Sequence, residues 1–243
     1  MPYILDIILM YAGGIIMLLI SIDGACRRNG MPNCVAAGGV FVQHFDENLH
    51  LTNTLTMSNY EVASTNQRGE LLALLTALEY ICAVKQPAQI VTDSEYLFNA
   101  VTKEWFKSWS HKGWVTAIGE PVKNKDLWQK IHYSYSKLEE LSVDIAFYHI
   151  KGHCIPFGKV TANTLLSKNL TGAQLMSEVF LKYDSVCEST KKTNLEQANI
   201  LSEKNNGFKF TPDKLRQFVV ANVVADAVAT KCVDAADVLC NRQ

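Results

Sequence analysis

The stretch Ile90–Asn99, IVTDSEYLFN, constrains the fold more than any other part of the chain. A short apolar run of β-strand type ends at Thr92-Asp93-Ser94 and passes directly into a helical pattern. A strand that delivers an aspartate beside a helix start places a carboxylate at the edge of a sheet, where α/β proteins build their sites. The stretch therefore predicts an α/β fold with an acidic group at a sheet edge.

Three strands are predicted before this stretch, as an antiparallel meander. The apolar run over residues 15–23 has the pattern of a strand covered on both faces, and it is expected to end at Asp23 in a polar turn. Strands over Val35–Gln43 and Leu49–Met57 follow, and Gly38-Gly39 in the second predicts a close backbone approach or a bulge.

The pattern after the meander alternates helices with two further strands. We expect, in chain order, a helix from an N-cap at Ser64-Thr65-Asn66 to Val84, a strand at Ala88–Asp93, helices at Glu95–Thr102 and Lys123–Glu140, a strand at Val143–His149, and a last helix from Thr211-Pro212 to about Val233. This order describes a mixed five-stranded sheet flanked by helices.

Four carboxylates occupy distinctive places in this scheme: Asp23 and Asp93 at strand ends, Glu70 early in the first long helix, and Asp226 on the last helix. Any one of them alone is more often a helix cap or a surface residue. Together they repel one another unless cations neutralise them. Mg²⁺ prefers such oxygen ligands, and two ions can stabilise the attacking and leaving oxygens of a displacement at phosphorus.

Five short motifs contain or adjoin these acids: SIDGACRRN at 21–29, TNQRGEL at 65–71, TDSEY at 92–96, KGH at 151–153 and NVVAD at 222–226. In this order they resemble the motifs of type 1 ribonuclease H. The resemblance implies the ribonuclease H-like fold with sheet order 3-2-1-4-5. It also implies endonucleolytic hydrolysis of the RNA strand of RNA–DNA hybrids, which leaves 5′-phosphate and 3′-hydroxyl ends.

The resemblance also implies roles for individual residues. Asp23, Glu70, Asp93 and Asp226 would hold two Mg²⁺ ions, with Mn²⁺ as a substitute, and His153 on a mobile loop would assist proton transfer or product release. The residues expected near the minor groove of the hybrid are Cys26, Asn29, Asn66 and Glu95. Asn222 lies four positions before Asp226, so both can face the site from one side of the helix.

The stretch 102–125 is locally basic in a chain whose formal net charge is −1. Lysines interleaved with aromatic residues can hold phosphates while ring faces pack on sugars or bases. The alternative is that the tryptophans belong to the core and the lysines to a solvated helix face, which we prefer for Trp128. The stretch resembles the basic protrusion, or handle, with which several ribonucleases H grip the DNA strand. The handle residues are Lys103, Trp105, Lys107, Trp109, Lys112, Trp114 and, as a contact to DNA phosphate, Asn124.

The chain departs from the family pattern between His153 and Asp226, which are 73 positions apart here and far closer in the family. The extra segment, 154–210, is predicted to hold helices at Thr171–Cys187 and Asn194–Ser202. It could be a helical cap packed on the domain, a lid that extends the hybrid-binding surface, or a docking site for a protein partner.

The length of 243 residues suits one domain with an addition. We divide it into an apolar extension at 1–14, a core at 15–153, the insertion at 154–210, and a final core helix with a tail at 211–243. No Lys or Arg precedes the apolar run in the first twenty residues, and Asp6 and Gly13-Gly14 interrupt it, which argues against a signal peptide or a membrane span.

The seven cysteines form no C-x-x-C pair and no metal-ligand spacing, so we expect reduced thiols in a cytoplasmic or nuclear protein and not a disulfide framework. We expect a monomer that binds an RNA–DNA hybrid. Three rival interpretations stay open: another nuclease on the same fold, a non-catalytic or gated hybrid-binding scaffold, and a membrane-tethered version that uses the N-terminal run.

Overall fold

The computed structural model describes residues 17–152, 174, 176–181, 202–205, 208 and 211–240. The predicted N-terminal extension, His153, and most of the 154–210 insertion lie outside these residues.

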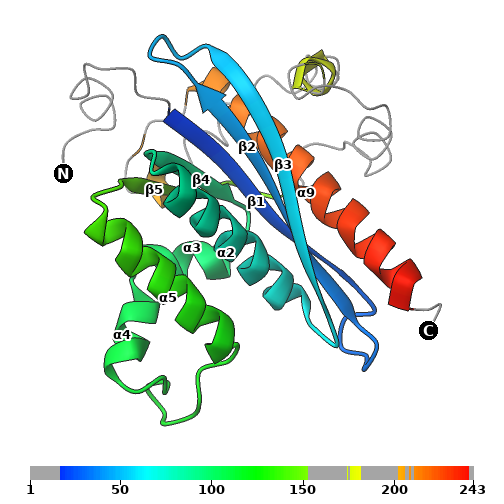
Figure 1. The fold of residues 1–243 in the computed structure, drawn as a ribbon, viewed down its shortest axis with the longest axis vertical. Helices are drawn as coiled ribbons and strands as arrows, with labels where there is room; N and C mark the ends of the chain where they lie inside the picture. Colours follow the sequence, from blue (N-terminus) through cyan, green and yellow to red (C-terminus); the bar gives the residue numbers. More distant parts are fainter. Residues whose placement is uncertain are drawn as a thin grey trace.

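The fold is built on one five-stranded sheet with the order β3-β2-β1-β4-β5 (Figure 1). β1 (Met17–Arg27), β2 (Val35–Phe45) and β3 (Leu51–Val62) form an antiparallel meander. β4 (Ala88–Thr92) pairs in parallel with β1, and β5 (Ile145–His149) pairs in parallel with β4. The predicted sheet and its strand order are confirmed.

Helices cover both faces of this sheet. α2 (Asn66–Val84) and α5 (Lys125–Glu140) lie on one face, and α9 (Pro212–Cys240) lies on the other (Figure 1). Successive residues of β1 divide between the two sides, since Leu18 and Ile20 join the cluster under α2 whereas Leu19 joins the cluster under α9. This two-sided burial explains why the first part of β1, from Met17 to Ile22, is almost wholly apolar.

The predicted end of the first strand at Asp23 is wrong. β1 continues to Arg27, and Asp23 pairs with Gly39 in the middle of the β1–β2 ladder. Asp-Gly is a common turn signal, but pairing with β2 overrides it here. The chain turns later, between Arg27 and Val35, where Gly30 has a φ of 83°.

Several other boundaries differ from the prediction. β2 ends at Phe45 rather than Gln43, and β3 spans Leu51–Val62 rather than Leu49–Met57. β3 is an edge strand that exposes most of its side chains, so its apolar alternation is weak. The helix predicted from Lys123 begins at Lys125, the strand predicted from Val143 begins at Ile145, and α9 runs to Cys240 rather than to about Val233.

Two shorter helices follow β4. α3 (Glu95–Thr102) has the predicted bounds, and the hydroxyl of its N-cap Ser94 accepts a hydrogen bond from Leu97 N. α4 (Trp105–His111) is a separate helix that the sequence pattern did not distinguish from the surrounding loop. Its length of 7 residues is too short for a periodic apolar stripe to stand out.

Gly38 and Gly39 allow the two helical layers to approach the sheet closely. A Cβ at Gly38 would collide with the α2 backbone at Ala73, and one at Gly39 would collide with the α9 backbone at Ala225. The predicted close approach is therefore confirmed. The register shift between β2 and β3 lies elsewhere, at His44 and Phe45.

Parts of the insertion lie among the described residues. Gln174 and residues 176–181 are helical, within the helix predicted at Thr171–Cys187. Met176 and Val179 are buried in the cluster under α9. Residues 202–204 are also helical. No helix in the described part of the chain is both long enough and apolar enough to span a bilayer.

Candidate active site

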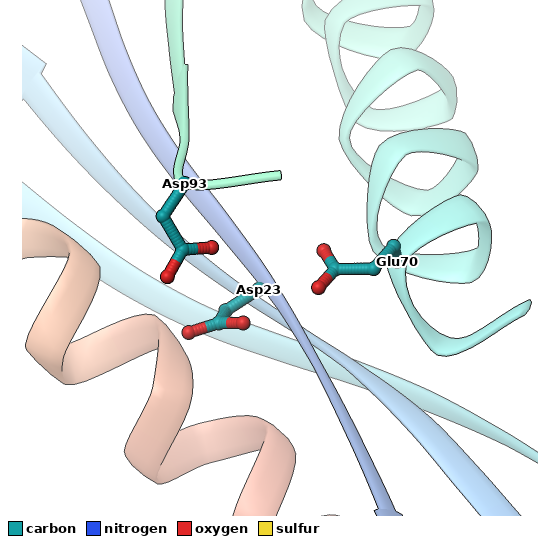
Figure 2. Close-up of side chains that lie close together, drawn as sticks. All are labelled: Asp23, Glu70 and Asp93. Atoms are coloured by element: carbon teal, nitrogen blue, oxygen red, sulfur yellow. The ribbon is translucent and has the colours of Figure 1, made fainter. Parts of the chain in front are cut away.

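Three acidic side chains converge at the edge of the sheet where β4 ends. One carboxylate oxygen from each of Asp23, Glu70 and Asp93 lies within 4.8 Å of the others. Figure 2 shows the three carboxylates pointing toward one another from β1, α2 and the turn after β4. Segments far apart in the sequence therefore form one acidic cluster.

Asp226 on α9 completes the set of four predicted acids. It lines the same cavity as the other three, which has a volume of about 330 Å³. The hydroxyl of Thr230, one turn further along α9, lies 3.3 Å from Asp226 Oδ1 and donates to it. The structure thus brings together all four acids that the sequence singled out.

The position of the cluster follows from the sheet topology. β4 pairs with β1 only as far as the Ser21–Val91 pair, whereas β1 continues alongside β2. Asp23 thus lies just beyond the end of the parallel ladder, at the point where strand direction changes and α/β sheets open a crevice. Gly24 lets α2 approach this point, since a Cβ there would lie 2.6 Å from Glu70 N.

Burial and mutual repulsion raise the pKa values of the two most buried acids. The pKa of Asp23 lies well above its ordinary value because the side chain is desolvated and faces Asp93, Glu70 and Asp226. Desolvation and Asp93 raise the pKa of Glu70 to about 8. The hydrogen bond that Gly24 N–H donates to Asp23 Oδ1, with a length of 2.7 Å, offsets part of the increase in the pKa of Asp23. The charged cluster is therefore electrostatically unfavourable on its own.

Among the described residues that line the cavity, the one basic side chain is paired outside it. Arg27 lines the cavity, but its guanidinium pairs with Asp234 at 2.6 Å. Glu70 Oε2 is buried and has no hydrogen-bond partner among the described residues. Hard divalent cations take carboxylate oxygens as ligands, and Glu70 Oε2 is available for this within the described part of the chain. The acidic cavity therefore fits a divalent metal site.

The residues predicted to contact the minor groove gather beside this cavity. Cys26 and Asn66 line it. Asn29 Oδ1 accepts a hydrogen bond from Asn66 N at 3.3 Å and lies 3.8 Å from Cys26 Sγ. Glu95 is exposed at the start of α3, directly after Ser94 of the lining. We call Cys26, Asn29 and Asn66 the rim cluster.

Asn222 is buried one turn before Asp226, with 6% of its surface exposed. Its Nδ2 has no hydrogen-bond partner among the described residues. A solvated polar face, the alternative to a site role, is thus excluded for this residue. Asn222 does not belong to the cavity lining, so its contact with substrate stays a prediction.

The tryptophans of the predicted handle pack largely against the protein itself. Trp105, Trp109 and Trp114 are partly buried against the cluster under α2. The rings of Trp109 and Trp128 meet edge to face with centroids 5.5 Å apart. Trp128 is fully buried, as expected for a core residue.

The lysines of the handle differ among themselves. Lys107 pairs with Glu104 at 2.8 Å and with Glu139 at 2.7 Å, which the sequence did not indicate. Lys103 Nζ lies 5.8 Å from the centroid of the Trp105 ring, and Lys112 is exposed at the end of α4. Asn124 is the N-cap residue of α5 and lies outside the acidic cavity. The grip on a DNA strand stays a prediction for all of them.

Sequence reasoning missed two residues that support the site. Thr230 was recognisable only from its spacing of four residues from Asp226. Arg68, inside a motif already noted, pairs with Glu61 at 2.5 Å and with Asp126 at 2.6 Å. It thereby ties the first turn of α2, and with it Glu70, to β3 and α5.

Comparisons with known proteins agree with this geometry. A family model described as RNase H matches residues 17–169. The chain is 38% identical over 138 residues to a ribonuclease H of Prosthecochloris aestuarii, covering 56% of this chain and 83% of the relative. It is 37% identical over 132 residues to a ribonuclease H of a Cyanothece species, covering 54% of this chain and 74% of that one.

Among solved structures, the chain resembles LC9-RNase H1, a type 1 RNase H with the type 2 active-site motif, with a TM-score of 0.49. The sequence identity is 21%, and the match covers 59% of this chain and 67% of that one. The family match and the two relatives show that the chain belongs to the RNase H family.

Proposed function

We propose that this chain is a divalent-metal-dependent ribonuclease H that cleaves the RNA strand of RNA–DNA hybrids. Cleavage is endonucleolytic and leaves 5′-phosphate and 3′-hydroxyl ends. Membership of the RNase H family supports the reaction, and relatives of the chain are named for it.

The observation that carries this proposal is the convergence of Asp23, Glu70, Asp93 and Asp226 on one cavity. Burial and, after it, mutual repulsion raise the pKa values of Asp23 and Glu70, which is a cost to the folded state. A site that combines strong pKa perturbation with a concave, polar lining is the expected signature of function rather than of structure. A purely structural role would not require four acids from β1, α2, α9 and the end of β4.

We further propose Mg²⁺ as the physiological ion, with two ions held by the four acids and Mn²⁺ as a substitute. Such ions, when bound, polarise the phosphate and stabilise charge on the attacking and leaving oxygens. The protein supplies the orientation of its own carboxylates. Gly24 N–H holds the Asp23 carboxylate, and the Thr230 hydroxyl holds that of Asp226.

The rim cluster is the proposed reader of the RNA strand. Distinguishing RNA from DNA requires a contact with the 2′-hydroxyl, which can donate and accept hydrogen bonds. Cys26, Asn29 and Asn66 offer such groups beside the acidic cavity. The exposed lysines Lys103 and Lys112 of the handle are the proposed contacts to the other strand. For His153, which lies outside the described residues, we propose the role in proton transfer or product release that the resemblance implies.

A cleavage assay with one sequence in several pairings tests the proposal. The labelled strand is presented as RNA–DNA hybrid, duplex RNA, duplex DNA and single strands, each with Mg²⁺, Mn²⁺ or EDTA. We expect cutting of only the RNA strand of the hybrid, abolished by EDTA, with ends that a ligase and a phosphatase identify. Cutting of duplex DNA, or cutting that survives EDTA, would overturn the proposal.

A further inference from the structure

The side chain of Asn205 binds the backbone of the edge strand β5. His149 N–H donates to Asn205 Oδ1 over 2.7 Å, and Asn205 Nδ2 donates to the carbonyl oxygen of His149 over 2.9 Å. Both residues are buried, with 6% and 7% of their surfaces exposed. One amide therefore satisfies both backbone groups of the last β5 residue.

The strand geometry explains why this residue is the one held. Ile150 N donates to Thr92 O, so the peptide groups of Ile150 face β4. Those of His149, one residue earlier, face the opposite side, where the described sheet has no further strand. Buried backbone groups there need partners. A primary amide has a donor and an acceptor in one plane and can supply both.

His149 in turn contacts the acidic cluster. In the tautomer with its proton on Nε2, its ring donates to the backbone oxygen of Asp93 over 3.2 Å. The ring also packs against Phe98, with centroids 5.6 Å apart. Just beyond, Gly152 lies so close to Asp93 that a Cβ would collide with the carboxylate. The end of β5 and the Asp93 turn are therefore one packed unit.

Neighbouring residues of the insertion dock on the same strand end. The Phe208 ring lies 4.6 Å, centroid to centroid, from that of Tyr148 on β5. Met176 belongs to the same apolar cluster as Tyr148 and Ile150. Asn205 is thus part of a docked segment rather than a single surface contact.

We propose that Asn205 is a positioning residue of the active site, acting through His149 on Asp93. This residue of the insertion thereby contributes to the geometry of the carboxylates that are proposed to bind metal. The inference rests on the proposed metal site. Partners that orient metal ligands typically change metal affinity or activity by about 10–100-fold when they are removed.

The test compares Asn205→Ala with Met176→Ala in the full chain. Met176 is 2% exposed in the same docked segment, so its truncation costs packing without touching the β5 backbone. Asn205→Asp is a third variant of equal volume, whose carboxylate can accept from His149 N–H but cannot donate to the carbonyl. Mg²⁺ affinity of the metal-free proteins is measured by calorimetry, and kcat and KM are measured on the hybrid.

We expect both Asn205 variants to lose about tenfold or more in Mg²⁺ affinity and in kcat, with KM for the hybrid unchanged. Met176→Ala should lower the melting temperature but keep Mg²⁺ affinity and kcat within about twofold. His149→Phe retains an aromatic ring beside Phe98 but cannot donate to Asp93, so it should show the same loss of Mg²⁺ affinity.

Unchanged Mg²⁺ affinity in folded Asn205→Asp or Asn205→Ala would overturn the proposal, and so would an equal loss in Met176→Ala. The outcome is separable from that for the proposed function. If the wild-type chain binds Mg²⁺ but does not cleave hybrid, the proposed function fails, while the calorimetric comparison still decides the role of Asn205.

Discussion

The acidic cavity buries groups that repel one another, whereas the aromatic layer between α4 and α5 buries rings that pack favourably. This layer consists of Phe106, Trp128 and Tyr135. In the cavity, four carboxylates lie together, and their burial and mutual repulsion raise the pKa values of Asp23 and Glu70. In the aromatic layer, Phe106 stacks on Trp128 with an interplanar angle of 5° and meets the Tyr135 ring at 4.9 Å. Lys107 at its edge is paired twice.

This difference separates the part of the molecule that stabilises the fold from the part that performs chemistry. Aromatic packing contributes burial plus about 0.5–1.5 kcal/mol per ring pair. A cluster of like charges instead lowers the stability of the fold until a cation binds to it. Four sets of substitutions test this difference between stabilising and functional residues, in order of decreasing expected effect.

Asp93→Asn should lower the rate of hybrid cleavage by about three orders of magnitude or more, because metal-ion stabilisation of the reacting oxygens is worth several kcal/mol. Binding of the hybrid, measured by fluorescence anisotropy, should change little. The matched control is Asp144→Asn, an exposed acid that precedes β5 at the opposite end of the strand. Comparable rates for the two variants would remove Asp93 from the site.

Arg68→Ala should lower the free energy of unfolding by about 2 kcal/mol, because it leaves Glu61 and Asp126 without their shared partner. The Arg68 side chain is only 17% exposed. Lys107→Ala breaks two ion pairs that are more exposed than those of Arg68, and it should lower the free energy of unfolding by about 0.5 kcal/mol. Urea denaturation measures both values. Equal losses would show that Arg68 does not anchor α2.

Replacing Lys103 and Lys112 together with Ala should weaken hybrid binding by about tenfold at low salt and reduce the salt slope by about two. Both residues are exposed on the handle. Lys130→Ala, an exposed lysine on α5, serves as the control. If the slope of log Kd against log salt stays the same in the double variant, the handle does not hold the hybrid.

Glu70→Gln should stabilise the metal-free protein at about pH 8 by on the order of 1 kcal/mol, or about 2–4 °C in melting temperature. Desolvation and Asp93 raise the pKa of Glu70 from 4.5 to about 8. Between these values the folded chain binds more protons than the unfolded chain, so its stability falls as pH rises. The advantage of the variant should vanish near pH 4. If Glu70→Gln were less stable than the wild-type chain at both pH values, the charged Glu70 side chain would not destabilise the fold, and this account would be contradicted.

The strands and the four acids could be predicted from local signals, whereas the order of the strands in the sheet was implied by the resemblance to type 1 ribonuclease H. The first part of β1 and most of β4 are apolar, and the acids occur in motifs with fixed spacing. The position of Asp23 within its strand could not be predicted in this way. The same Asp-Gly pair suits a turn or a strand, and tertiary contacts decide between them, since both residues pair with β2 and α2 approaches Gly24 closely.

Contacts between residues far apart in the sequence could not be predicted either. Lys107 looks like a free handle lysine until Glu139 of α5 is placed 2.7 Å away. Asn205 has no periodic or motif signal, and its role appears only when β5 is found at the sheet edge with His149 facing outward. Such pairings depend on tertiary packing, which neither propensity nor spacing encodes.

The most direct measurement is a calorimetric titration of Mg²⁺ into the metal-free chain near neutral pH, in two buffers of different ionisation enthalpy. We expect binding with net proton release, because Asp23 and Glu70 have raised pKa values and must ionise when the cation enters. Asp23→Asn should weaken this binding at least about tenfold. Binding that is equally tight in Asp23→Asn, or that releases no protons, would contradict a metal site in the acidic cavity.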